Sequence, residues 1–354
     1  MAGSDGYRWR TGDGRFDTAE ACTAPNVRAV TVRAPELHPE ARMLVEEAAE
    51  RGLPPTHALS VRTARETFVD HLTAFDGPDV ERVRDLGIPG PNGELRIRLY
   101  EPIATGSSVA QGGASDADPR PALVFFHGGG WVRGSVETHD ELCRWLANEV
   151  DCTVVSVDYR RAPEHPFPAA LRDCEAAVRW VVEHAGSIGV DPDRIAVGGD
   201  SAGGNLAAAV SLLARDADGP RLRHQVLVYP VTDHAFETRS YEENAEGYLL
   251  TRETMRWYWA QYLRTELDGA NPYVSPLRAR TLADLPSATV VTCGFDPLRD
   301  EGVAYAERLA DHGVDVAHHH YDDTVHVFVS IPGLERTRQA RTAIAENLLE
   351  AFER

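Results

Sequence analysis

Lysine is absent from the 354-residue sequence. All 36 basic residues are arginine, and 55 acidic residues bring the net charge to −19. Because such a surface repels phosphate groups, we expect neither nucleic acid nor an anionic membrane as a partner. The acidic excess predicts a halophilic protein: in 1 M salt the Debye length falls to about 3 Å, so carboxylates cease to repel one another. A GC-rich genome would account for the arginines but not for the carboxylates.

Long apolar runs are also missing. No stretch approaches the roughly 18 apolar residues that cross a membrane, and Met1–Arg8 lacks the apolar core of a signal peptide. We therefore expect a cytoplasmic protein. The sequence is compatible with self-association into a homo-oligomer and does not decide it.

Cysteine is scarce, and its five residues are scattered without a C-x-x-C pair. They are Cys22, Cys143, Cys152, Cys174 and Cys293. This pattern predicts free thiols in a reducing compartment rather than disulfides or a zinc site, so we expect no metal.

Short apolar runs separated by amphipathic stretches dominate the chain from residue 122 onward. With 43% hydrophobic residues, the chain can build one large domain with a sizeable core. Continuous apolar runs are typical of strands buried on both faces, and their alternation with helices predicts an α/β fold with a mostly parallel, doubly wound sheet. The expected strands are Leu95–Tyr100 (half-exposed), Ala122–Phe126, Thr153–Val157, Ile195–Gly198, Gln225–Tyr229, Ala288–Cys293 and Val314–Tyr321. The expected helices are Ala170–His184, Ala202–Ala214, Gly302–His312 and Glu335–Phe352.

Two helical stretches precede the first strand. Apolar residues recur at helical spacing in Glu36–Arg51, and a second helix runs from Ser60, a candidate N-cap, to about Phe75. Because they lie before the sheet, we expect residues 34–80 to form a helical cap over an α/β domain at 81–354. Residues 1–33 are polar and irregular, which indicates an N-terminal extension.

An aromatic-rich insertion at about 233–272 interrupts the alternation. It contains Tyr248, Trp257, Tyr258, Trp259 and Tyr262. A helix packed on the core is one interpretation. We favour a second part of the cap that lines a pocket, because ligand pockets are mostly apolar and aromatic. Residues 105–120 are of low complexity and predict a surface loop.

The pentapeptide Gly199-Asp200-Ser201-Ala202-Gly203 follows an apolar run and opens a helical one. G-x-S-x-G in this strand–turn–helix context predicts a nucleophile elbow, in which the serine takes a strained backbone conformation beside glycines that remove clashing Cβ atoms. The helix N-terminus at Ser201 favours a developing negative charge.

A glycine run, His127-Gly128-Gly129-Gly130-Trp131, directly follows the expected strand Ala122–Phe126. Consecutive glycines allow backbone N–H groups to face one point, as in an oxyanion hole. A phosphate-binding loop is the alternative, but the G-x-x-x-x-G-K-[ST] pattern is absent. Together the two motifs predict a serine hydrolase.

An acid and a base are expected downstream, in the order Ser…Asp…His. Asp296 stands at the carboxyl end of a strand, where open α/β sheets place their ligand crevice; Asp300, its competitor, is better explained as a helix N-cap. For the base we favour His326, in the loop after the last strand. The other histidines downstream of Asp296 are His312, on a helix, and His318, His319 and His320, whose alternating directions in a strand argue against a shared metal.

These motifs resemble those of the bacterial hormone-sensitive-lipase-like esterases (family IV), a branch of the α/β-hydrolases. The resemblance covers roughly residues 35–353 and rests on His127–Trp131, Asp158–Ala170, Gly199–Asn205, Asp296–Gly302 and His326. It implies an α/β-hydrolase fold with a helical cap. Val327 departs from it, because the family usually has Gly after the catalytic histidine, and this leaves the backbone of that loop open.

The resemblance also implies roles for the individual residues. Ser201 attacks an ester carbonyl, His326 takes its proton and later protonates the leaving alcohol, and Asp296 fixes the imidazole tautomer. The N–H groups of the oxyanion hole belong to Gly129, Gly130 and Ala202, with His127 and Gly128 in the supporting loop. The expected substrate-pocket residues are Trp131, Asp200, Tyr248 and Trp257.

The sequence therefore predicts a carboxylesterase that acts on small-molecule esters with short to medium acyl chains and uses no cofactor. An amidase such as a formamidase, or a deacetylase, is the alternative, because the elbow and oxyanion loop serve any acyl group. A non-catalytic small-molecule receptor is less favoured. Plant gibberellin receptors resemble this family but have lost the base, which is present here as His326.

Overall fold

An eight-stranded sheet forms the centre of the computed structural model, which describes residues 33–52, 54–103 and 119–354. The chain divides into two units, Met1–Val30 and Thr31–Arg354, of which only the second contains described residues. Apart from Arg33 and residues 119–120, the predicted extension and surface loop lie outside the described residues.

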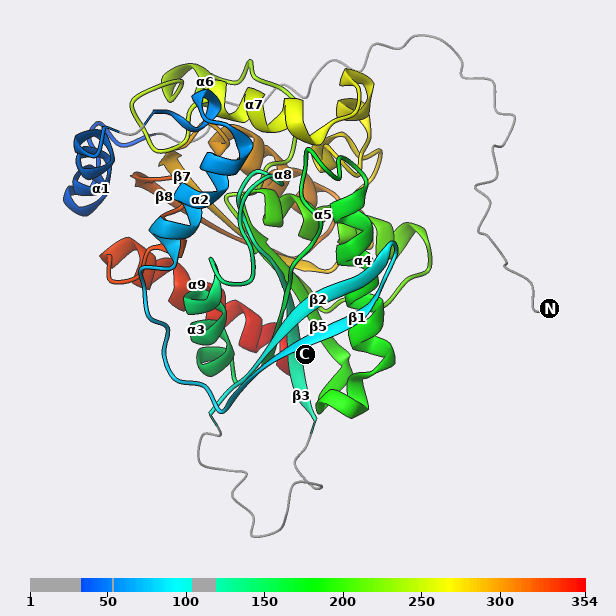
Figure 1. The fold of residues 1–354 in the computed structure, drawn as a ribbon. Coiled ribbons are helices and arrows are strands. Elements are labelled where there is room, and N and C mark those ends of the chain that lie inside the picture. Colours follow the sequence, from blue (N-terminus) through cyan, green and yellow to red (C-terminus); the bar gives the residue numbers. More distant parts are fainter. Residues whose placement is uncertain (1–32, 53, 104–118) are drawn as a thin grey trace, which may run out of the picture. The chain divides into compact units, whose positions relative to one another are not determined.

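The strand order in the sheet is β1-β2-β4-β3-β5-β6-β7-β8 (Figure 1). β1 and β2 form an antiparallel hairpin, β2 pairs antiparallel with β4, and every pair from β4–β3 to β7–β8 is parallel. This confirms the predicted α/β fold with a mostly parallel, doubly wound sheet. The strands are β1 Arg82–Gly90, β2 Gly93–Glu101, β3 Arg120–Phe126, β4 Thr153–Val157, β5 Val190–Asp200, β6 His224–Val228, β7 Ser287–Phe295 and β8 Val316–Val325.

Helices cover both faces of the sheet (Figure 1): α3 and α9 pack on one face, and α4, α5 and α8 on the other. The α-helices are α1 Pro39–Glu50, α2 Val61–Leu72, α3 Asp140–Val150, α4 Ala169–Glu183, α5 Ala202–Asp216, α6 Arg239–Glu243, α7 Arg252–Tyr262, α8 Arg299–Asp311 and α9 Glu335–Glu353. The 3-10 helices are η1 Thr56–Ala58, η2 Ala185–Ile188, η3 Glu266–Ala270, η4 Pro276–Arg278 and η5 Phe328–Ser330.

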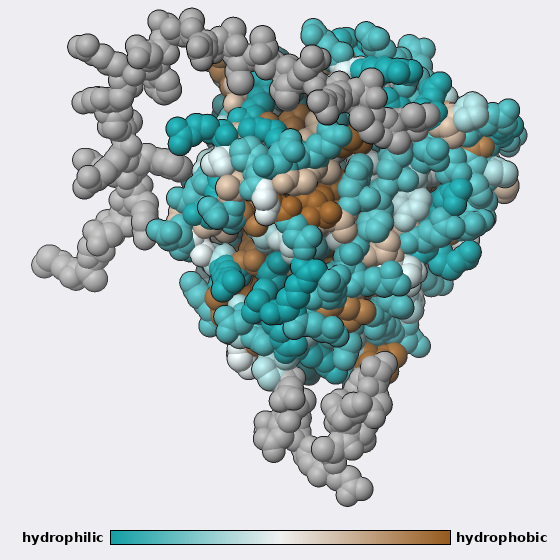
Figure 2. Space-filling model, turned by 180° about the vertical axis from the view of Figure 1, so that it is seen from behind, coloured by the Kyte–Doolittle hydropathy of each residue, from teal (hydrophilic) through white to brown (hydrophobic). Residues whose placement is uncertain are grey.

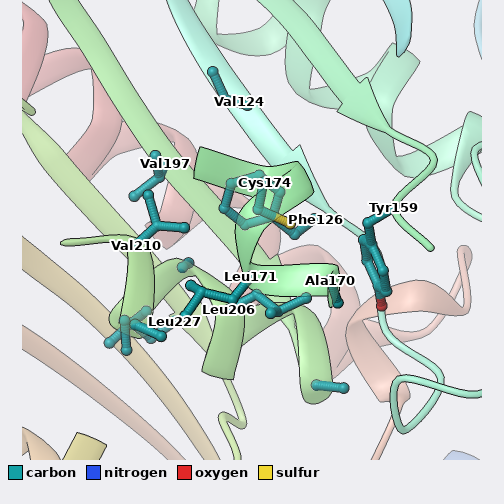
Figure 3. Close-up of a cluster of buried hydrophobic side chains, with 14 of the residues drawn as sticks. Val124, Phe126, Tyr159, Ala170, Leu171, Cys174, Val197, Leu206, Val210 and Leu227 are labelled. Atoms are coloured by element: carbon teal, nitrogen blue, oxygen red, sulfur yellow. The ribbon is translucent and has the colours of Figure 1, made fainter. Parts of the chain in front are cut away.

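Strand β3 shows how the two layers of core are built. Val124 and Phe126 point to the side of α4 and α5, where they belong to the apolar cluster of Figure 3, whereas Leu123 and Phe125 point to the side of α3 and α9. All four are at most 2% exposed. Burying a side chain of this size stabilises the fold by about 1.5–3 kcal/mol. A strand that is apolar at every position is therefore stabilised by packing on both faces of the sheet.

The helices expected before the sheet are present with later starts and earlier ends. α1 begins at Pro39, a residue suited to the first helical turn, and Ser60 caps α2 by accepting the Thr63 N–H at 3.1 Å. The Ser60 N-cap is thereby confirmed. In Figure 1, α1 and α2 lie at the same end of the sheet as α6 and α7 of the insertion. The assignment of residues 34–80 to a separate cap stays a prediction.

Within the described ranges, no helix has the length and apolarity needed to cross a membrane. The described cysteines, Cys143, Cys152, Cys174 and Cys293, are buried free thiols; Cys22 lies outside the described residues. The face shown in Figure 2 is mainly hydrophilic, and its apolar residues gather in small patches.

Candidate active site

Ser201 stands at a sharp turn between β5 and α5, with φ 56° and ψ −117°. The turn brings the chain against the carboxyl end of β3. A Cβ atom on Gly203 would lie 1.8 Å from the Phe126 carbonyl oxygen, and one on Gly199 would lie 2.3 Å from it. Only glycine fits at both positions, so the G-x-S-x-G pattern reflects a close backbone approach as well as the strained conformation of the serine.

Three parallel strands place three polar side chains at the carboxyl end of the sheet. Ser201, Asp296 and His326 each come directly after the last residue of a strand, β5, β7 and β8 respectively. The carboxyl ends of parallel strands meet at a common crevice. His326 Nε2 lies 3.0 Å from Ser201 Oγ, and His326 Nδ1 lies 2.7 Å from Asp296 Oδ2.

The buried hydrogen bonds fix the tautomer of His326. A carboxylate only accepts, so Nδ1–H donates to Asp296 and Nε2 is left to accept the Ser201 hydroxyl proton. Asp296 is itself held, because its Oδ1 accepts the Leu298 N–H at 2.9 Å. The three side chains are nearly removed from solvent: Ser201 is 8%, His326 3% and Asp296 0% exposed.

Asp300 is bound elsewhere. Its carboxylate accepts the Ser240 N–H at 2.8 Å and pairs with Arg299. The expectation that Asp300 is the N-cap of its helix is wrong, since α8 begins at Arg299 after Leu298 and Asp300 is its second residue. The helix starts earlier because the Leu298 N–H is already satisfied by Asp296.

The other candidate histidines also lie apart from Ser201. His318 and His320 both contact Thr292 Oγ1, at 2.8 and 2.9 Å, while His319 contacts Asn347 on the opposite face of β8. The alternation expected from a strand is confirmed. His312 reaches Thr281. No group of metal-ligating side chains occurs among the described residues.

The glycine run forms a tight loop after β3. Gly129 and Gly130 have φ values of +122° and +62°, and a Cβ atom on Gly130 would lie 2.3 Å from the Tyr258 ring. Within the described part of the chain, the N–H groups of Gly129, Gly130 and Ala202 donate to no acceptor. Three unused backbone donors thus lie in the two segments that flank Ser201.

Asp200 ties this loop to the elbow. Its Oδ1 accepts the Gly128 N–H at 2.8 Å and lies 3.0 Å from His139 Nε2. Burial alone would raise the pKa of the Asp200 carboxyl, but His139 and the Gly128 N–H outweigh it and keep that pKa below its usual value. Both side chains are buried, Asp200 at 2% and His139 at 1% exposure. No local sequence pattern points to His139.

His127 supports the loop from behind. Its ring stacks on Tyr159 with centroids 4.1 Å apart, and its Nδ1–H donates to the Gly128 carbonyl at 2.9 Å. Burial, reinforced by neighbouring His139, lowers the pKa of His127 to about 3. His127 is therefore a neutral structural residue at physiological pH.

Ser201 and His326 open into a cavity of about 530 Å³. Its lining comes from α1, η1 and α2 on one side and from the insertion, including Tyr248 and Tyr258, on the other. Mainly apolar side chains form the wall. They include Leu44, Val45, Leu59, Phe68, Leu72, Phe75, Leu249, Leu250 and Ile331.

Two of the four expected pocket residues do line this cavity, namely Asp200 and Tyr248. Trp131 and Trp257 are not among its described lining residues, so that expectation is corrected. Trp131 is fully buried and stacks on Tyr262 with centroids 4.3 Å apart. Its positive φ of 59° belongs to the turn that directs the indole into the core. Trp257 packs edge-on against Tyr258.

Val327 and Arg133 also line the cavity, and the sequence analysis did not assign either to it. Val327 has φ +67° and ψ −1°, the left-handed conformation that favours glycine. The backbone after His326 therefore keeps the glycine-type turn, although a β-branched residue occupies this position.

Comparisons with known proteins agree with this geometry. A family model described as the α/β-hydrolase fold matches residues 123–330. The carboxylic ester hydrolase LipN of Mycobacterium tuberculosis is 43% identical over 79% of this chain and 77% of its own length. The arylesterase of Saccharolobus solfataricus is 41% identical over 77% and 85%. A solved ester hydrolase from the metagenome of Lake Arreo has a TM-score of 0.83 and 40% identity, covering 90% of this chain and 100% of that one.

Proposed function

The chain belongs to the α/β-hydrolase family and is a carboxylic ester hydrolase, and we propose that Ser201, His326 and Asp296 perform the hydrolysis through an acyl-enzyme intermediate. The observation that carries this proposal is the continuous hydrogen-bonded chain from Ser201 Oγ through His326 to Asp296. The Ser201–His326 distance of 3.0 Å lies within the range needed for proton transfer, and the 2.7 Å contact with Asp296 holds the imidazole in place.

In the acylation step, His326 Nε2 takes the Ser201 proton as Oγ attacks the ester carbonyl. The imidazolium that forms is stabilised by the Asp296 carboxylate, which lies 2.7 Å from Nδ1 and is held in place by the Leu298 N–H. Nε2–H then protonates the leaving alcohol. In deacylation, His326 takes a proton from water as the water attacks the acyl group, and returns that proton to Ser201 Oγ when the carboxylic acid product leaves.

Negative charge develops on the carbonyl oxygen in both steps. The unused N–H groups of Gly129, Gly130 and Ala202 are the donors we assign to it. Each such donor is worth on the order of 10²–10³ in rate, since it is oriented before the charge appears. The N-terminus of α5, which begins at Ala202, adds to this stabilisation.

The size and lining of the cavity favour substrates with short to medium acyl chains. A volume of about 530 Å³ with a mainly apolar wall suits a small ester, and the lining residues Leu44, Phe68 and Ile331 offer an apolar surface to an alkyl chain. We therefore expect kcat/KM to rise with acyl length over a few carbons and then to fall.

The test is hydrolysis of a series of p-nitrophenyl esters, from acetate to laurate, by the wild type and by Ser201→Ala. We expect Ser201→Ala to lower kcat by about 10⁴-fold or more. Ser330→Ala is the matched control, because Ser330 lines the same cavity but its hydroxyl lies near Tyr229. Activity that survives Ser201→Ala at the level of Ser330→Ala would overturn the proposed nucleophile.

A further inference from the structure

Arg133 follows the oxyanion loop and lies on the wall of the cavity. Its backbone N–H donates to the Gly129 carbonyl at 2.8 Å, which fixes the residue to that loop. Its guanidinium lies between two aromatic rings from the two sides of the cavity, 4.3 Å from the centroid of Phe68 on α2 and 5.3 Å from that of Tyr258 on α7. The guanidinium thus lies over both rings, and an aromatic ring accepts none of its directional N–H hydrogen bonds as an oxygen would.

The N–H groups of the guanidinium are mostly unused. Nη1 donates to Thr56 Oγ1 at 3.2 Å, whereas Nε, which is buried, and Nη2 donate to none of the described residues. Because Nη2 has no partner among the described residues and, unlike Nε, is not enclosed, it can donate to a carboxylate in the cavity.

Arg133 also has no counter-ion among the described residues. Of the carboxylates in the described ranges, none lies within 4.0 Å of its nitrogens. Burial lowers the pKa of Arg133, and only the Tyr258 hydroxyl acts in the opposite direction. An arginine nevertheless stays charged at neutral pH. In a chain with 55 acidic and 36 basic residues, an arginine without a carboxylate is unexpected on composition alone.

The other charged groups of the cavity do not compensate Arg133. Asp200 is already engaged by Gly128 and His139, and Glu47 is an exposed residue of α1. Arg51, the other lining arginine, is exposed as well. A packing role alone would not need a charge, because an unbranched apolar side chain fills the space between two rings without desolvating a cation.

We propose that Arg133 is the anion-binding residue of the substrate cavity and that the enzyme acts on esters that carry a carboxylate in their acyl or alcohol part. This inference rests on the proposed function, since it places a carboxylate-bearing ester in the cavity that contains Ser201. The carboxylate accepts from Nη2 and neutralises the guanidinium, while the apolar wall holds the carbon chain.

Matched substrate pairs test the proposal at one KCl concentration. The first pair is p-nitrophenyl hydrogen glutarate and p-nitrophenyl pentanoate, with the charge in the acyl part. The second is 4-acetoxybenzoate and phenyl acetate, with the charge in the alcohol part. The quantity measured is the ratio of kcat/KM for the anionic ester to that for the neutral ester. We expect Arg133→Met to lower this ratio about 10- to 100-fold in at least one pair.

Two further variants separate recognition from structure. Arg133→Lys keeps the charge and should retain much of the ratio. Arg51→Met removes an exposed arginine from the same cavity and should change the ratio less than twofold. If Arg133 only holds α2 against α7, Arg133→Met lowers both rates of each pair by the same factor, and an unchanged ratio in both pairs overturns the proposal. An equal loss in Arg51→Met, which indicates general attraction, also overturns it.

Failure of the proposed function gives a different result. If Ser201 is not the nucleophile, Ser201→Ala still hydrolyses the neutral member of each pair, whatever the ratio does. If Ser201 is the nucleophile but Arg133 has no role, neutral hydrolysis depends on Ser201 and the ratio is insensitive to Arg133.

Discussion

The carboxylate of Asp200 accepts the backbone N–H of Gly128 at 2.8 Å, and so joins the residue before Ser201 to the loop that carries the proposed oxyanion donors. The approach is close: a Cβ atom on Gly128 would lie 2.3 Å from Asp200 Oδ2. His139 Nε2 lies 3.0 Å from Oδ1, the oxygen that accepts the Gly128 N–H. Asp200 is therefore a positioning residue that acts through Gly128.

Replacement of Asp200 by Ala should lower kcat about 10- to 100-fold for a neutral ester, because the loop loses its anchor while its N–H groups remain. KM should change less than threefold. Asp200→Asn keeps an oxygen that accepts the Gly128 N–H and should restore most of kcat. Steady-state kinetics and melting curves of both variants are the measurement. Equal kcat in Asp200→Ala and the wild type would remove the positioning role.

The acid of the triad can be tested against its nearest competitor in sequence. Asp296→Asn should reduce kcat by on the order of 10⁴, because an amide no longer selects the His326 tautomer whose Nε2 accepts from Ser201. Asp300→Asn, four residues further on, should leave kcat within about threefold, since Asp300 contacts Ser240 and Arg299. The reverse order of the two effects would show that the acid is misassigned.

Local sequence was sufficient for much of the site. The position of Ser201 follows from glycines that only a strand–turn–helix requires, and Asp296 and His326 follow from their places after strands. The arrangement of the buried strands could be predicted because their apolar runs are continuous. β1 was missed because Arg82–Gly90, at the edge of the sheet, carries charges, Gly and Pro within the strand.

The contacts that shape the cavity depend on pairs distant in sequence. Asp200 meets His139, and Arg133 meets Phe68 and Tyr258, across separations that no local pattern encodes. Trp131 was misplaced for the same reason: its aromatic partner, Tyr262, lies in the insertion. The position of Trp131 next to the glycine run predicts a pocket residue, but the turn directs its side chain to the core.

Val327 offers a test of backbone strain. In an L-residue the left-handed conformation costs about 1–2 kcal/mol. Glycine avoids this cost, and the gain exceeds the loss that comes from glycine's greater conformational freedom in the unfolded chain. Val327→Gly should therefore raise the melting temperature by about 2 °C. Its kcat for short esters should equal that of the wild type, because His326 keeps its contacts with Ser201 and Asp296.

Val69→Gly is the control for the Val327 variant. Val69 lies on α2 at 37% exposure and has ordinary helical geometry, so its replacement should lower the melting temperature. A lower melting temperature in both variants would mean that the Val327 side chain stabilises the loop by more than its strain costs.

His224 predicts a pH dependence of stability. Burial lowers the pKa of His224 to about 4, from about 6.5 in an unfolded chain. Because the unfolded state binds the proton more readily, the stabilisation is fully present above pH 6.5 and is lost as the pH falls towards 4. The contribution changes by about 1.4 kcal/mol per pH unit in that window.

His224→Gln removes this titration and should flatten the dependence of the unfolding free energy on pH. At pH 8 the variant should be less stable than the wild type, because the contacts with Ser287 and Thr289 are weakened. At pH 5 the difference should be smaller by about 2 kcal/mol. Denaturant unfolding at the two pH values is the measurement, and a difference that stays constant would contradict the assignment.

The chain has 55 acidic and only 36 basic residues, and this imbalance leads to a prediction about salt dependence. We propose that melting temperature and esterase activity rise from dilute buffer to molar KCl, because salt screens repulsion between carboxylates. Glu46 and Glu50 provide a local probe: they are exposed, four residues apart on α1, and in no ion pair with another described residue. The double variant Glu46→Gln, Glu50→Gln should melt higher than the wild type in dilute buffer and equal to it in 2 M KCl. A wild type that is fully stable and active in dilute buffer would show that its carboxylates need no screening.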